Sequence, residues 1–366
     1  MKDIIVYDFD FNKKVILTNV QSINYTLYYN AVGTAELHMY INPFLMALLN
    51  NNTPLVMVHD DIQWIVTGYK VNINELIVFG RTLNHLFTKR IVVPFVTVDI
   101  LNPNGMDAQS LVRKLLTESY LLDRTEYWTG KGNNAKIYDD NHSAVTLKKV
   151  DNFVLGEPIS GTFTPKAYRR DTVHDLMTLV KEYLDYIAAG HQLYFDIPNR
   201  RWVFKAWLGN EIPIVISDDN RTGSDFEKTY EAQDAFNCGI YSKDESEDTP
   251  LEYYYYGGKY DDTIPTILRQ EASLSGKTEA EARKSMATKY AKDTLKASVY
   301  RLQYGRDYKL GDILTFQFNY GGVDFTNKMY VKAVSIAWDK DIYTCTPTLA
   351  SLDDRTIDEE SDKDGN

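Results

Sequence analysis

The stretch YGRDYKLGDILTFQFNYGG, residues 304–322, decides the fold class of this chain. It opens with polar residues, passes through a Gly-Asp pair and continues as LTFQFNY, in which apolar and polar residues alternate. Such alternation is typical of a β-strand with one buried face, and Gly-Asp is typical of a turn. We therefore predict a structural turn at Gly311 and Asp312, with Leu310 and Ile313 anchoring the strand that follows.

The first hundred residues repeat this pattern. Short segments with alternating apolar residues are separated by Asn, Asp and Gly at intervals of about 8–12 residues, which favours a barrel or sandwich. The segments are KKVILTNV, INYTLYYN, AELHMYIN, PLVMVHD, QWIVTGYKV and ELIVFG. The last segment ends at Gly80, which we predict as a further structural turn residue. Between them, NPFLMALLNN has a proline at a probable first turn and predicts a short helix.

The next region predicts two helices. In the first, Asp107 is the expected N-cap. The apolar residues after it are spaced for one helical face, and the charged and polar residues between them are expected to face solvent. The apolar set is Leu111, Val112, Leu115, Leu116 and Tyr120, and the solvent set is Arg113, Lys114, Thr117 and Glu118. Residues 129–144 read as an exposed loop.

A second helix is predicted within residues 171–190, with one apolar face and Gly190 as its C-terminal cap. That face comprises Val173, Leu176, Met177, Val180 and Leu184. Residues 191–208 then predict a hairpin with an Asn-Arg turn, and YYYY at 253–256 predicts a strand.

The last third of the chain predicts one more helix and three strands. Residues 275–298 are highly charged, and Thr278 and Glu281 have capping-box spacing, so we predict a helix there. TFQFNYGG, NKMYVKAVSIAWD and IYTCTPTLA are the strand candidates. The final fourteen residues are acidic and nearly free of apolar side chains, which predicts a disordered tail or linker.

Composition narrows the class of function. The net charge of −11 argues against a broad nucleic-acid surface, and two cysteines cannot form a disulfide framework. The 27 tyrosines suit β-structure and wet interfaces, although a compositional bias explains them equally well. The N-terminus lacks the pattern of a signal peptide, and no segment has the apolar length of a membrane span. We expect a soluble protein made in the cytoplasm.

We expect no catalytic residue, cofactor site or metal site. His59-Asp60-Asp61 reads as a turn between strands, and residues 139–142 read as a solvated loop without EF-hand spacing. Neither cysteine, Cys238 or Cys345, lies in a protease signature, and no G-x-S-x-G or phosphate-binding loop occurs. The doubled arginines at 169–170 and 200–201 are interpreted as helix-start and turn residues.

The order of several segments resembles the bacteriophage tail-hub family, which includes the N-terminal module of siphophage tail-associated lysins and contractile-phage baseplate hubs. The segments that carry the resemblance are INYTLYYNAVGTAELHMYI, ELIVFGRTLNHLFTKRIVVP, YGRDYKLGDILTF and VKAVSIAWDKDIYTCTPTL. Their order matches over most of residues 1–352. The resemblance implies a homotrimer in which two related barrel-like domains per subunit form a pseudo-sixfold ring, and no catalytic residues.

The implied fold is mainly β with α+β insertions: two related β-barrel-like domains plus smaller helix-containing domains, in the tail-hub architecture. The expected domains are 1–100, a first barrel-like domain; 101–235, an α+β region with two helices; 236–352, a second barrel-like domain with a charged helix; and 353–366, an acidic disordered tail or linker. Tail-associated lysins often continue into a lytic region, so any such activity is expected in a separate protein or a removed portion.

The implied function is a non-enzymatic hub in the virion, at the tail tip or baseplate. Its implied partners are a distal tail protein or tail tube, the tape-measure protein and tip or receptor-binding proteins, with DNA passing through its channel without specific binding. One alternative is a carbohydrate-binding or polysaccharide-degrading host-recognition protein; another is a homologue from a prophage or a bacterial injection machine. The five tryptophans are scattered along the chain, which favours the structural function.

Overall fold

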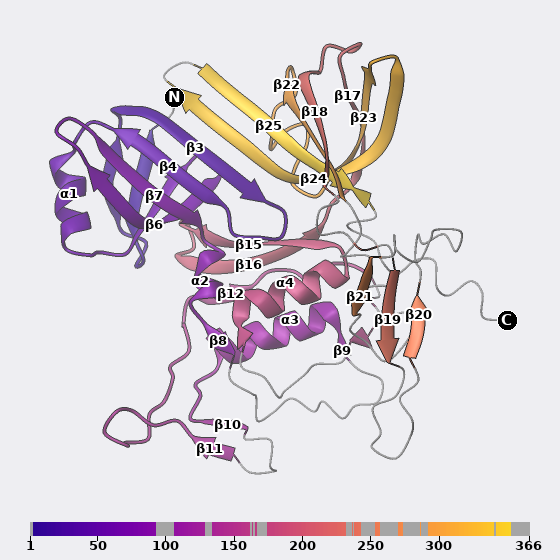
Figure 1. Ribbon diagram of the computed structural model, residues 1–366. Helices are drawn as coiled ribbons and strands as arrows, with labels where there is room; N and C mark the ends of the chain where they lie inside the picture. Colours follow the sequence, from indigo (N-terminus) through magenta and orange to yellow (C-terminus); the bar gives the residue numbers. More distant parts are fainter. Residues whose placement is uncertain are drawn as a thin grey trace. The chain divides into compact units, whose positions relative to one another are not determined.

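The computed structural model resolves the chain into two compact units (Figure 1). Unit 1 comprises residues 1–210, 303–312 and 332–346, and unit 2 comprises the remaining residues. The structure describes residues 3–92, 106–128, 134–161, 163, 165–166, 174–231, 236, 238–242, 253–256, 270–273, 286, 292–339 and 342–352. The expected disordered tail, 353–366, lies outside these residues.

The main sheet of unit 1 is antiparallel, with the order β24-β3-β4-β7-β6-β5-β1-β2. Its strands are β1 (Ile4–Asp8), β2 (Lys13–Leu17), β3 (Val20–Tyr28), β4 (Thr34–Met39), β5 (Leu55–His59), β6 (Ile62–Val71), β7 (Leu76–Thr82) and the C-terminal part of β24 (Val323–Asp339). Strands β3 and β4 bury alternate residues, as their alternating sequences predict. Residues 333–339 pair with β3, so this sheet needs a strand far outside the first hundred residues.

The predicted short helix is confirmed as α1 (Pro43–Asn50). The Asn42 side chain accepts a hydrogen bond from the backbone N–H of Leu45, and Pro43 occupies the first turn, where its missing N–H costs nothing. The chain then enters α2 (His85–Thr88) and β8 (Ile91–Val92), which pairs with β14 (His174–Asp175).

Both longer predicted helices are confirmed, the first with its predicted cap Asp107 and the second with an N-cap, Asp175, that the sequence analysis did not name. In α3 (Ala108–Leu116), the Asp107 carboxylate accepts from the N–H of Ser110, and in α4 (Leu176–Tyr186), Asp175 accepts from that of Thr178. The predicted apolar faces are buried: Leu111, Val112, Leu115 and Leu116 in α3, and Leu176, Met177, Val180 and Leu184 in α4. Val173 lies outside the described residues. Figure 1 shows the two helices side by side.

The expected exposure of Glu118 is wrong, because its side chain is buried. After Leu116 the chain continues as a π-helix, η1 (Thr117–Leu121). A π-helix has more residues per turn than an α-helix, so the α-helical spacing that predicted a solvent-facing Glu118 does not apply here. Glu118 and Ser119 turn inward instead, and Tyr120 is only half-buried and stacks on Phe153.

Two further sequence predictions need correction. Helix α4 ends at the cap residue Ile187, so Gly190 is not its cap and lies in β15 (Ala189–Asp196). The left-handed residue after α4 is Ala188, with φ of 53°. The helix predicted over residues 275–298 is wrong in its last part, because residues 292–299 form a strand. Of its remainder, the described residues include only Met286.

Strand β15 forms a hairpin with β16 (Arg201–Leu208), closed by the predicted turn at Asn199 and Arg200. The backbone edge of β15 away from β16 is bound by amide side chains. Gln63 both donates to the carbonyl of Phe195 and accepts from its N–H. Asn84 donates to the carbonyl of His191 and accepts from the N–H of Leu193. The edge is thus paired, which prevents association with another strand.

The hairpin packs between the first strands of the chain and helices α3 and α4, and the largest core cluster lies here. Phe11 stacks on Phe195 at 4.0 Å between ring centroids, and Trp202 meets Phe195 edge-on at 4.8 Å. Strand β12 (Phe153–Leu155) adds to the hairpin in parallel with β16. The remaining short strands are β9 (Met106–Asp107), β10 (Glu126–Trp128), β11 (Asn134–Lys136) and β13 (Pro165–Lys166).

Unit 2 is also mainly β. Its strands are β17 (Glu211–Ser217), β18 (Gly223–Glu231), β19 (Cys238–Ser242), β20 (Tyr253–Tyr256), β21 (Glu271–Ser273), β22 (Lys292–Val299), β23 (Ile313–Tyr320) and the other parts of β24 and β25 (Ile342–Ser351). The strands predicted after residue 313 and at YYYY are confirmed. β18 pairs with β22 and β22 with β25, while β23 lies between β17 and β24.

The mainly-β class is confirmed, but the sheets are not closed barrels. In the described part of unit 1 the strand order is an open path with β2 at one edge. Lys13 and Lys14 lie on this edge strand, and such charges discourage further strand pairing. The two compact units differ in their boundaries from the three structured domains expected from the sequence, and that division stays a prediction.

Candidate functional site

The predicted turn residues Gly311 and Asp312 lie in a tightly packed turn of unit 1. Gly311 has φ of +89°, a conformation that L-residues rarely adopt, and a Cβ added there would lie 2.2 Å from the Tyr29 ring. The Asp312 carboxylate accepts hydrogen bonds from the backbone N–H groups of Lys309 and Asn210, at 2.8 and 3.0 Å. The turn is thereby joined to the end of β16.

Tyr29 contacts several segments of unit 1 that lie far apart in the sequence, and the sequence analysis did not identify it. Its hydroxyl lies 2.9 Å from the carbonyl oxygen of Ala188 and 3.0 Å from that of Trp207, and it accepts from the N–H of Gly209. Its own N–H donates to the carbonyl of Lys332. The sequence does not distinguish Tyr29 from its neighbour Tyr28, which has the same side chain but is exposed.

Gly80, the other predicted turn residue, is placed inside β7, which continues to Thr82. A Cβ on Gly80 would lie 1.9 Å from the ring of the fully buried Trp64. The glycine therefore makes room for the indole beneath the sheet. The structure does not bring Gly80 together with the turn at Gly311.

The residue clusters considered for catalysis or metal binding have structural roles. His59 is buried, shares a 3.1 Å hydrogen bond with Tyr25, and precedes a turn in which Asp60 has φ of 53°. Asp139 accepts from the N–H groups of Asn141 and Ser143 and so closes its own loop. Among the described residues, no group of three His, Cys, Asp or Glu side chains could hold a metal ion.

The thiol of Cys345 is buried and shares a hydrogen bond of 3.1 Å with the Tyr308 hydroxyl. Burial raises its pKa, although hydrogen bonds from Tyr308 and Tyr343 act in the opposite direction. A thiol with a raised pKa is a poor nucleophile, because the thiolate is the reactive form.

Arg169 and Arg170 lie outside the described residues. Within them, no helix is long and apolar enough to cross a membrane.

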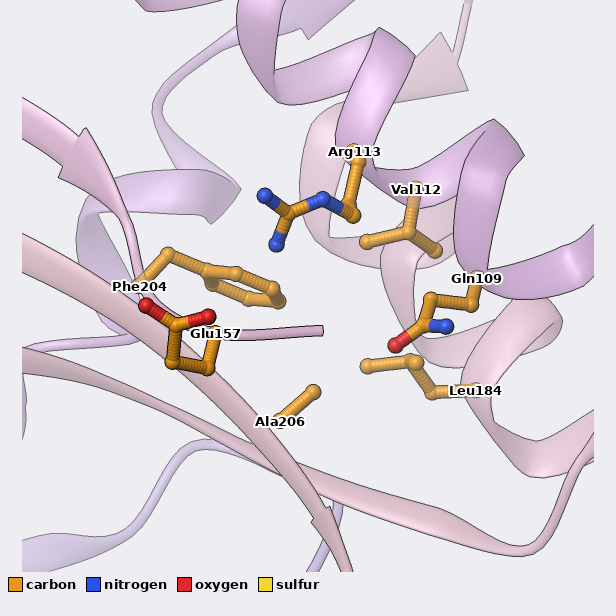
Figure 2. Close-up of a pocket in the computed structure, with 7 residues that line it drawn as sticks. All are labelled: Gln109, Val112, Arg113, Glu157, Leu184, Phe204 and Ala206. Atoms are coloured by element: carbon orange, nitrogen blue, oxygen red, sulfur yellow. The ribbon is translucent and has the colours of Figure 1, made fainter. Parts of the chain in front are cut away.

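A small cavity lies between α3, α4 and the hairpin strand β16 (Figure 2). Its volume is about 10 Å³, the space of a single water molecule. Two of the polar side chains that line it are engaged elsewhere: Arg113 donates to the carbonyl of Gly156, and Gln109 donates to that of Ile159. This cavity is therefore a packing gap and not a ligand site.

His38 on β4 is held between two carboxylates on the surface of the sheet. Its Nε2 lies 2.7 Å from Glu36 Oε1, and its Nδ1 lies 2.8 Å from Glu75 Oε1. Partial burial lowers the pKa of His38, but the hydrogen bonds to Glu75 and Glu36 outweigh it, so the pKa is raised above its usual 6.5. The hydrogen bond from His38 in turn lowers the pKa of Glu75.

We expect the contribution of His38 to stability to disappear at alkaline pH. A raised folded-state pKa gives stability that is fully present below the unfolded pKa of 6.5 and is lost as pH rises through the higher folded value. The variant His38→Gln should melt below the parent chain at pH 5.5, and the two melting temperatures should converge at pH 9. An equal gap at both pH values would show that the imidazolium is not involved.

The most conspicuous exposed feature of unit 1 is an apolar surface at one end of the main sheet. Met39 pairs with Leu76, which pairs with Val71, so the segment after β4 and the β6–β7 turn lie at the same end. Helix α1 lies there too, since the Tyr69 hydroxyl donates to the Asn50 side chain (Figure 1). The exposed side chains of this end surface are Tyr40, Ile41, Phe44, Tyr69, Val71 and Ile73.

Such an end surface is unusual for an isolated protein. Ile73 is 93% exposed and Phe44 is 77% exposed, and four further exposed large apolar side chains belong to segments at the same end of the sheet. Contiguous exposed apolar patches mark sites of protein association. The sequence analysis missed this surface because Ile73 lies in a turn and Phe44 lies in a helix, so no one periodic pattern of apolar residues includes both. The sequence does contain one indication of it, because the turn VNINE at residues 71–75 has an isoleucine between two asparagines, where a polar residue is usual.

The family of the chain follows from comparison with known proteins. A family model described as Siphovirus ReqiPepy6 Gp37-like protein matches residues 3–349. The chain belongs to this family. As a member of the Gp37-like family it is a phage tail protein, and the resemblance to phage tail proteins expected from the sequence is confirmed. No curated protein matches the chain.

Solved structures of phage tail proteins share the fold of this Gp37-like family member. A tail protein of Neisseria meningitidis MC58 is 12% identical, with a TM-score of 0.58 over 97% of this chain and 98% of that one. The 43 kDa tail protein of prophage MuSo2 from Shewanella oneidensis is 10% identical (TM-score 0.55; 97% and 100% covered). Prophage tail protein gp18 from Listeria monocytogenes EGD-e is 13% identical (TM-score 0.55; 95% and 94% covered).

Proposed function

We propose that the chain is a non-enzymatic structural hub of a phage tail tip, which assembles as a homotrimeric ring. The observation that carries the proposal is the apolar end surface on a member of a phage tail protein family. The ring joins the tail tube or a distal tail protein to the tape-measure protein and to the tip, receptor-binding or lytic components. The protein is made in the host cytoplasm and is located in the virion at the tail tip or baseplate.

The end surface is suited to a contact between copies of the chain. A ring needs a heterologous interface, in which one patch meets a different patch on the next subunit and the rotation closes. Tyr40 and Tyr69 add aromatic rings with polar hydroxyl groups. Tyrosine is enriched at protein interfaces, because its ring can be buried in the contact while its hydroxyl is solvated before assembly. The edge strand β2 is unsuitable, because Lys13 and Lys14 are exposed on it and Lys14 pairs with Asp8 at 2.7 Å.

The charge of the chain agrees with passage of DNA through such a ring. With a net charge of −11, the protein repels phosphate on average, and a channel that releases DNA must not bind it. The proposal therefore includes DNA as a passing molecule and not as a ligand.

Aspartate on the end surface should prevent assembly without unfolding the chain. We expect Ile73→Asp and Phe44→Asp each to weaken self-association by about 100-fold, because a charge would be buried in an apolar contact. Light scattering over a concentration series measures this as a fall from trimer to monomer mass. Both side chains are exposed, so the melting temperature should change by only about 2 °C or less.

The matched control is Ile342→Asp, which alters an exposed isoleucine of unit 1 in another strand, β25. It should keep the parent mass at every concentration. A parent chain that remains monomeric at the highest concentration, or an Ile73→Asp variant that remains trimeric, would contradict the proposed interface.

A further inference from the structure

We propose that the outer face of the main sheet in unit 1 carries a binding groove for a neutral oligosaccharide. The groove has a volume of about 410 Å³, within the range of small-molecule sites, and crosses strands β3, β4, β7 and β6. The side chains that carry the proposal are Asn24, Thr26, Thr34, Glu36, Phe79 and Arg81. This site is separate in function from the end surface and does not depend on ring assembly.

Strand register places these side chains in two adjacent rows. In the first row, Asn24 pairs with Glu36, Glu36 with Phe79, and Phe79 with Gly68. In the second row, Thr26 pairs with Thr34, and Thr34 with Arg81. Alternation along each strand points both rows to the face opposite the buried core residues Tyr25, Leu37 and Val78. The rows thus form one continuous polar surface with an aromatic ring in it.

The polar groups of the groove are available to a ligand. Within the described chain, no hydrogen bond is made by the amide of Asn24, by the hydroxyls of Thr26 and Thr34, or by the guanidinium of Arg81. Glu36 is held in place through one carboxylate oxygen by His38, at 2.7 Å. The set offers both donors and acceptors, as a ligand with many hydroxyl groups requires.

Phe79 provides an apolar platform beside these polar groups. Its side chain is 38% exposed although it lies in a central strand. The residue opposite is Gly68, and a Cβ there would contact only Phe79, at 4.0 Å. The glycine therefore leaves one side of the ring uncovered. A sugar ring has an apolar face of C–H groups and a polar rim, so it can cover the phenyl ring while its hydroxyls reach the neighbouring rows.

The groove is less suited to other ligand classes. A peptide cannot add as a strand, because β3, β4, β7 and β6 each have a neighbouring strand on both sides. A strongly anionic ligand would meet Arg81 together with Glu36, whose charges offset one another. With balanced charge, several uncommitted hydrogen-bonding groups and one bare aromatic ring, the lining is complementary to a neutral polyhydroxylated molecule.

The test is isothermal titration calorimetry of the full chain with maltotetraose, cellotetraose and N-acetylchitotetraose. A heparin-derived sulfated tetrasaccharide serves as the charged comparison. We expect at least one neutral oligosaccharide to bind with a Kd between about 10 µM and 1 mM, and Phe79→Ala to weaken it at least about tenfold. Gly68→Val should also weaken binding about tenfold, because the added side chain covers the Phe79 ring, while φ at Gly68 permits valine.

Tyr230→Ala is the matched control, since it removes an exposed aromatic ring on β18 of unit 2, outside the groove, and should leave sugar binding unchanged. Failure of the two proposals is distinguishable, because Phe44 and Ile73 variants report on mass and Phe79 and Gly68 variants report on sugar affinity. The inference is overturned if no neutral oligosaccharide binds, if the sulfated one binds more tightly, or if Phe79→Ala and Gly68→Val both retain parental affinity while folded.

Discussion

Valine at position 311 is expected to lower the free energy of unfolding by about 3–5 kcal/mol. Gly311 has φ of +89°, which a β-branched residue adopts only with strain, and its Cβ would lie 2.2 Å from the Tyr29 ring. Both costs arise in the folded state only. Urea denaturation of Gly311→Val should show a lower midpoint with an unchanged slope.

Gly305→Val separates the two causes. Gly305 has nearly the same conformation, with φ of +87°, but no atom lies within 4 Å of a Cβ built there. This variant should cost only the backbone strain, about 1–2 kcal/mol. If both valine variants lose the same stability, then contact with Tyr29 contributes nothing, and our account of the turn is wrong.

Removal of the Tyr29 side chain should be comparably severe. We expect Tyr29→Ala to cost about 3–5 kcal/mol, because it leaves a cavity at a buried aromatic position and removes a hydroxyl that bonds to three backbone groups. Tyr29→Phe keeps the ring and should cost about 1–2 kcal/mol. The same urea experiment measures both values.

Tyr28→Ala is the matched control, since Tyr28 precedes Tyr29 in sequence but is exposed on β3, and its loss should be within about 1 kcal/mol. The double variant Gly311→Val/Tyr29→Ala adds a second check. Removing the ring gives the valine space, so the combined loss should be smaller than the sum of the single losses. A strictly additive result would mean that the two residues do not share one packed contact.

Local features of the sequence predicted local structure well. Asp107 is the predicted cap of α3, because its short side chain accepts from the backbone N–H three residues on, an interaction contained within one turn. Asn42 and Asp175 cap α1 and α4 in the same way, although neither was predicted as a cap. The alternating residues after Ile313 form the expected strand, since the period of a strand is also local.

Errors arose where a distant contact decided the outcome. Gly190 resembles a helix cap, but it lies in a strand where a Cβ would meet the Tyr29 ring at 2.2 Å. The charged residues from Lys292 onward favour a helix locally, yet they form β22 because β18 and β25 pair with both of its edges. The error at Glu118 has a local cause instead, because the π-helix rotates the side chains after Leu116 away from their α-helical positions.

The sequence by itself determined the β class, the cap of α3 at Asp107 and, through the order of its segments, the resemblance to phage tail proteins. Only the tertiary structure decided that β24 completes the first sheet, that Tyr29 rather than Tyr28 joins β3 to the Gly311 turn, and that Ile73 and Phe44 share one exposed end. The physical reason is distance along the chain. Caps and periods depend on neighbours within a few residues, whereas these contacts join segments that only folding brings together.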